Sequence, residues 1–251
     1  QQLYNMADTI IVGRYVGSDA LAAVGSTGTI IFLIVGFAQG ITAGFAVLTS
    51  QRFGAKDTEG VKISVANGIL LSLIFSVLLS SSSMLSMRTL LKLMNTPQNI
   101  FQDAYTYIMI ISAGIIATIF YNLLSSYLRA VGNSKIPLVF LVFSAALNVV
   151  LDLVLIINFK MGVAGAAYAT VFSQGISAIL CLIYIFVRMP DLAPNKRHWK
   201  LHGRESRHQL AMGIPMALQF AITASGTMIM QAAINLFGSD AVASFTAASK
   251  L

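Results

Sequence analysis

Charged side chains and cysteine are both scarce in this sequence. Charged residues make up 10% of the chain, whereas a soluble domain carries about 25%, so the composition excludes an ordinary soluble fold. The single cysteine excludes a framework of disulfides within the chain. The start of the sequence also lacks the basic region that opens a secretory signal peptide. Hydrophobic residues instead make up 57% of the chain, which predicts a polytopic membrane protein.

Long apolar runs recur along the chain. A helix that crosses the bilayer needs about 20 predominantly apolar residues, and only the first run is shorter than this. We therefore expect an all-α polytopic membrane protein: a six-helix lobe whose first helix is truncated, followed by the first helix of a second, repeat-related lobe. The expected helices cover residues 1–13, 21–50, 63–87, 104–128, 136–157, 162–187 and 210–237.

A short internal repeat supports two related lobes. GSDALAA at residues 17–23 follows the first predicted helix, and GSDAVAS at residues 238–244 follows the seventh. A spacing of six helices is typical of a parallel repeat of six-helix halves. We expect a first membrane lobe over residues 1–187, a linker over 188–209 and the start of the second lobe over 210–251. Because the chain begins without Met and ends within an apolar run, we also expect it to belong to a longer protein.

The excess of positively charged residues is concentrated in one of the two sets of loops. Loops after the predicted second, fourth and sixth helices carry eleven Lys and Arg residues, and loops after the first, third and fifth carry four. Basic loops stay in the cytoplasm, so the linker at residues 188–209 is expected there, and the net charge of +7 needs no nucleic-acid partner. We expect a monomer in a bacterial cytoplasmic membrane, surrounded by lipid, with a small-molecule substrate.

Two acidic residues lie inside apolar runs, Asp8 and Asp152, out of nine acids in the chain. A charged side chain at the bilayer centre costs at least about 2.5–3.5 kcal/mol, so it usually faces a cavity or a partner and has a function. Asn148 precedes Asp152 by four residues, so the two share one helix face. Two neighbouring buried carboxylates cannot both ionise cheaply, and a proton or a hard cation relieves this. The residues therefore indicate a site for Na⁺ or H⁺ without choosing between them.

Two other interpretations compete with a coupling site. Asn148 and Asp152 would serve packing alone if they only joined neighbouring helices by hydrogen bonds. An intramembrane aspartyl protease would also have two membrane aspartates, but it uses a GxGD motif, whereas Asp8 stands in NMADT and Asp152 in VVLDL. We therefore do not expect an enzyme. The ladder Gly36, Gly40 and Gly44 favours close helix packing.

Three stretches carry a family resemblance: QQLYNMADTIIVGRYVGSDALAAVG at residues 1–25, LRAVGNSKIP at 128–137 and ALNVVLD at 146–152. Together with the repeat and the linker, they make the chain resemble the multidrug and toxic compound extrusion (MATE) transporters over essentially its whole length. The resemblance implies twelve helices in two lobes around a cleft. It also implies cation-coupled antiport of drug-like, often cationic, compounds by alternating access, without a cofactor.

The resemblance also assigns roles to individual positions. It implies a cation site of the first lobe at Asp8, Asn148, Asp152 and Thr170, with no metal other than Na⁺ there. It implies that Gln1, Tyr4 and Tyr107 line the cleft.

The chain departs from the family pattern at two places. Leu153 stands where the family often has proline, which puts a bend there in doubt, and the seventh predicted helix lacks an acid, which points to coupling through the first lobe. The alternative function is a flippase for lipids or lipid-linked sugars of the same broad superfamily. Such a protein would favour basic residues inside the cleft, and this sequence has none at mid-depth.

Overall fold

The computed structural model describes the backbone of residues 2–250 and the side chains of residues 8–249. Within this range the chain is helical and contains no strand, which confirms the predicted all-α polytopic fold. The helices are α1 Gln2–Tyr15, α2 Ser18–Gly54, α3 Thr58–Leu93, α4 Phe101–Ala113, α5 Ile115–Ala130, α6 Lys135–Leu153, α7 Val163–Arg188, α8 Gly203–Asn235 and α9 Ser239–Lys250. A π turn, Val154–Asn158, continues α6, and a 3₁₀ turn, Lys196–His198, lies between α7 and α8.

Five of these helices are long and apolar enough to cross a membrane: α2, α3, α6 with its π turn, α7 and α8. The pair α4–α5 makes a sixth candidate span, bent by 48° at Gly114. The sequence predicts one helix over residues 104–128, and the bend falls where α7 packs closely against Gly114. A Cβ at position 114 would lie 2.4 Å from both methyl carbons of Val171, so only glycine lets α7 approach this closely.

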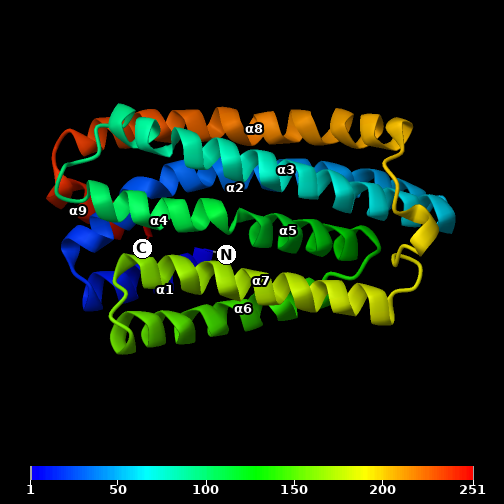
Figure 1. Ribbon diagram of the computed structural model, residues 1–251, viewed down its shortest axis with the longest axis horizontal. Coiled ribbons are helices and arrows are strands. Elements are labelled where there is room, and N and C mark those ends of the chain that lie inside the picture. The colour runs from blue at the N-terminus through cyan, green and yellow to red at the C-terminus, as the bar shows by residue number, and fades with distance from the viewer. Residues whose placement is uncertain (1, 251) are drawn as a thin grey trace.

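The helices form a bundle in which α8 lies along α2 and α3 (Figure 1). On the other side, α6 and α7 pack together, with α4 and α5 between the two groups (Figure 1). The largest apolar core joins α2, α3, α5 and α7 around Phe45, Tyr127 and Cys181, all fully buried. α8 begins at Gly203, within the range predicted to be a linker.

The glycine ladder on α2 sets the spacing between α2 and α8. A Cβ at Gly40 would lie 2.6 Å from the Cα of Ala217, and one at Gly44 would lie 2.3 Å from the Cα of Gly213. At Gly36 the nearest atoms belong to the side chain of Phe220, 3.3 Å away. The backbones of α2 and α8 therefore touch at Gly40 and Gly44, as small residues permit in membranes. We name this contact the seam, and the ladder serves packing.

Replacing Gly44 with alanine tests the seam. Because the new methyl group would meet backbone atoms of α8, we expect Gly44→Ala to lower the free energy of unfolding by about 1–3 kcal/mol, the usual cost of overpacking. Gly226→Ala is the matched control, since a Cβ there meets no atom within 4 Å. Thermal unfolding in detergent should separate the two variants, and equal melting temperatures would contradict the packing role.

Candidate cation site and cavity

Asp8 lies near the middle of α1 and is buried, with 4% of its surface exposed. The hydroxyl of Thr170 on α7 donates a hydrogen bond to Asp8 Oδ2, at 3.2 Å. This contact joins residues that are 162 positions apart in the chain. Two members of the predicted cation site, Asp8 and Thr170, therefore meet where α1 packs against α7.

Asn148 and Asp152 lie on the inward face of α6, and both are 0% exposed. Asp152 is close enough to Asp8 for the two carboxyl groups to interact electrostatically. However, neither side-chain oxygen of Asp152 and neither polar atom of Asn148 makes a well-formed hydrogen bond with residues 8–249. Buried polar groups are normally satisfied by protein or by water. Among residues 8–249, these side chains therefore have oxygen atoms available as ligands beside a pair of carboxyl groups.

The backbone of α6 explains why Asn148 and Asp152 lie on the same side of the helix. The helix runs through Asp152 and Leu153 without a break, so Asn148 and Asp152 stay one turn apart on one side. At Val154 the helix widens into the π turn, a form that often occurs near functional sites. The proline that is common at position 153 in the resembled family is absent, and the irregularity follows that position.

A cavity of about 260 Å³ opens on one side of Asp8. Its walls come from α1, α2, α4, α5, α7, α8 and α9, so it spans the first lobe and the start of the second. Asp8 is the only charged side chain among the described residues that line it. The polar lining residues are Asp8, Thr9, Thr29, Tyr107, Thr118, Thr170, Gln174, Gln231, Thr246 and Ser249.

The sequence-based assignments divide into three groups in space. Asp8, Thr170 and Tyr107 line the cavity. Asn148 and Asp152 are not among its lining residues and lie buried on α6, with Asp152 next to Asp8. The remaining two assignments, Gln1 and the side chain of Tyr4, lie outside the described residues. Asp8 is thus the residue that belongs both to the cavity and to the buried carboxyl pair.

Several lining residues were missed by the sequence reasoning. Gln174 follows Thr170 by one helical turn within an apolar run, which is a signal that could have been used. Gln231 is 2% exposed, and its amide donates to Asn235 Oδ1 at 2.9 Å. Thr246 and Ser249 come from α9. These residues on α8 and α9 meet the first lobe only through tertiary packing, so no local pattern marks them.

The geometry suits a small hard cation or a proton. Two carboxyl groups, one carboxamide and one hydroxyl supply oxygen atoms, the ligands that hard cations prefer. Because two close carboxylates repel each other in a medium of low dielectric constant, a bound positive charge stabilises the pair. From the cavity side, Asp8 can instead attract a positively charged group, because none of the described lining residues is Lys or Arg.

Comparisons with known proteins agree with this architecture. The chain is 32% identical to the "Probable multidrug resistance protein YpnP" of Bacillus subtilis (strain 168), over 100% of this chain and 56% of that protein. It is 29% identical to the "Probable multidrug resistance protein YoeA" of the same organism, over 98% and 54%. The chain therefore spans about half the length of the curated relatives it matches.

A solved structure and a family match complete the comparison. A multidrug resistance MATE family transporter of the MOP superfamily, solved in an inward-facing conformation, superposes with a TM-score of 0.91 at 28% identity. The alignment covers 99% of this chain and 57% of that one. Residues 1–154 match the MatE family. The chain is an integral membrane protein and belongs to the MatE family.

Proposed function

We propose that this chain forms the first lobe and the start of the second lobe of an antiporter in a bacterial cytoplasmic membrane. It exports drug-like, often cationic, compounds by alternating access and is driven by Na⁺ or H⁺. The relatives named as multidrug resistance proteins support the substrate class. The observation that carries the coupling proposal is the position of Asp8 between the cavity and the buried Asp152.

Competition for one negative charge provides the coupling. With the carboxyl pair unoccupied by a cation, Asp8 favours a positively charged substrate in the cavity. A proton or Na⁺ bound between Asp8 and Asp152 neutralises that charge and weakens the hold on the substrate. A ligand shifts a conformational equilibrium only by its difference in affinity for the two states. Binding of the cation on one side of the membrane and of the substrate on the other therefore drives the two in opposite directions.

The alternative function, a flippase for lipids or lipid-linked sugars, needs positive groups that bind phosphate. Arg and Lys are the side chains that recognise phosphate groups, and none of the described residues that line the cavity is basic. The acidic lining therefore favours export of cations. An enzymatic role has no support from the relatives, which are named as resistance proteins and transporters.

Removing either carboxylate is the direct test of coupling. We expect Asp8→Asn and Asp152→Asn to lower drug resistance by about ten-fold or more in cells that express the full-length protein, a loss within the range of coupled binding sites. Asp103→Asn is the matched control, because Asp103 is exposed at the start of α4. Normal export by both site variants would contradict the proposal.

The coupling ion is tested in vesicles loaded with a fluorescent cationic dye. An opposing gradient of Na⁺ or of H⁺, each applied with the other ion held equal on both sides, is expected to accelerate dye export by the unmodified protein. In Asp8→Asn neither gradient should do so, because the carboxyl pair is broken. Export that ignores both gradients in the unmodified protein would rule out cation coupling.

Replacing Tyr107 tests whether this part of the cavity wall binds substrate. The ring lines the cavity and offers an aromatic surface for organic cations. We expect Tyr107→Ala to raise the half-saturating concentration of planar cationic substrates roughly two- to thirty-fold, the range of a lost cation–π contact. Tyr15→Ala, at a tyrosine that is 52% exposed, serves as the control, and equal kinetics for the two variants would remove Tyr107 from the binding wall.

A further inference from the structure

The hydrophilic stretch between α7 and α8 contains a segment that lies against the first lobe. Residues 195–209, which we name the strap, comprise the 3₁₀ turn and the first two turns of α8. They lie at the end of the bundle opposite the α8–α9 turn (Figure 1). The exposed side chains of the strap include five of the chain's basic residues: Lys196, Arg197, Lys200, Arg204 and Arg207. Its inward side chains contact α2 and α3 at three successive places.

The first contact is at Glu59, in the first turn of α3. Arg197 Nη2 lies 2.6 Å from Glu59 Oε1. The amide of Asn195 donates to His198 Nδ1 at 3.0 Å, and His198 Nε2 lies 3.1 Å from Glu59 Oε2 and 3.2 Å from Arg197 Nε. The carboxylate of Glu59 thus contacts both Arg197 and His198 of the strap.

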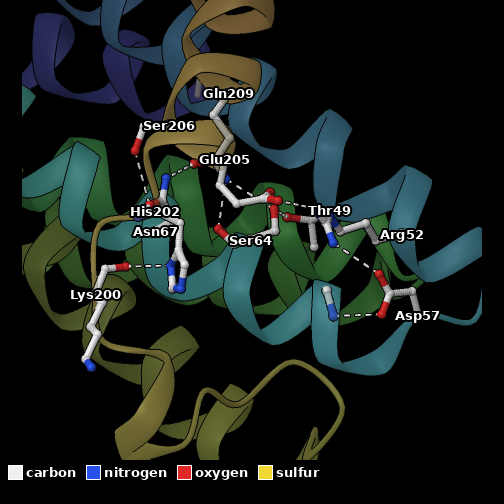
Figure 2. Close-up of polar contacts among 11 residues, drawn as sticks. Thr49, Arg52, Asp57, Ser64, Asn67, Lys200, His202, Glu205, Ser206 and Gln209 are labelled. Carbon is white, nitrogen blue, oxygen red and sulfur yellow. Dashed lines mark hydrogen bonds and ion pairs between the residues drawn. The ribbon is translucent and has the colours of Figure 1, made fainter.

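The second contact is at Asn67, which is fully buried within α3. Its Oδ1 accepts hydrogen bonds from the backbone amide of His202, at 2.9 Å, and from the hydroxyl of Ser206, at 3.2 Å (Figure 2). The first amides of a helix have no partner within the helix and need a cap. His202, the N-cap residue of α8, provides no side-chain cap of its own. Asn67 therefore caps α8 from another helix.

The third contact surrounds Gln209, which is also fully buried. Asn67 Nδ2 donates to Gln209 Oε1 at 2.8 Å, and Gln209 Nε2 donates to the carbonyl oxygen of Ser64 at 2.8 Å (Figure 2). One turn earlier, Glu205 forms an ion pair with Arg52 on α2, and Arg52 also binds Asp57 at 3.0 Å. The polar atoms of Asn67 and Gln209 are thus satisfied across the contact between α3 and α8.

We propose that the strap is a docked part of the first lobe rather than a flexible tether, and that Asn67, Glu59 and Gln209 are positioning residues for α8. A flexible tether would leave the buried amides of Asn67 and Gln209 without partners, which is unfavourable in a protein interior. Docking instead satisfies them and fixes where α8 begins. α8 also carries Gln231 to the wall of the cavity, so the strap holds the start of a helix that contributes to that wall. This inference holds whichever ion, if any, drives transport.

Limited digestion with trypsin tests the docking in the purified full-length protein in lipid nanodiscs. A mobile linker with five basic residues would be cut at once, whereas the docked strap is expected to be cut slowly. Asn67→Ala and Glu59→Gln should increase cutting within residues 195–209 by about ten-fold, since local opening controls proteolysis. Cutting after Lys135, at the start of α6, should not change. Asp191→Asn, at an exposed acid just before the strap, is the matched control.

The unmodified protein provides a second test that needs no variant. Because the amide of His202 is hydrogen-bonded to buried Asn67, deuterium uptake by peptides that cover residues 199–206 should be at least about ten-fold slower than in an unstructured segment. Uptake at the unstructured rate would overturn the proposal. Two results of the digestion would also overturn it. One is a strap that is cut equally fast in the unmodified protein, Asn67→Ala and Glu59→Gln. The other is an increase in cutting that is as large at Lys135 as at the strap.

Discussion

The placement of Asp8 beside Asp152, both buried among membrane-length helices, is the constraint that organises the rest of the molecule. Bringing them together requires α1, α6 and α7 to meet at one depth, and the hydrogen bond from Thr170 holds Asp8 in place. The opposite side of Asp8 then forms part of a cavity wall. One carboxyl group therefore faces the cavity on one side and the buried Asp152 on the other.

The sequence predicted the parts of this fold that depend on local composition. Apolar runs identified the membrane helices, and the spacing of Asn148 and Asp152 placed both on one face of α6, as found. The depth of the two aspartates in apolar runs indicated a shared function. The close approach of Val171 to Gly114 could not be predicted, because Val171 belongs to a helix far along the chain. The same reason hid the contributions of Gln231 and Thr246 to the cavity.

The stretch between α7 and α8 combines an exposed polar side with a side that packs on the first lobe. High charge and two prolines predict a linker, and the exposed half of the strap fits that description. The other half is matched to α3 through Glu59, Asn67 and Ser64. Asn67 lies in a largely apolar helix, where a fully buried carboxamide demands partners. Such a residue signals a tertiary contact, although sequence gives no indication of which segment supplies it.

The seam between α2 and α8 has a consequence for permeability. Where Gly40 and Gly44 face Ala217 and Gly213, there is no room even for one additional carbon atom, and a water molecule needs at least comparable space. A continuous file of water, along which protons or hydrated ions could leak, therefore cannot form between these two helices. The smallest side chains in the protein thus close this part of the contact between α2 and α8 to water.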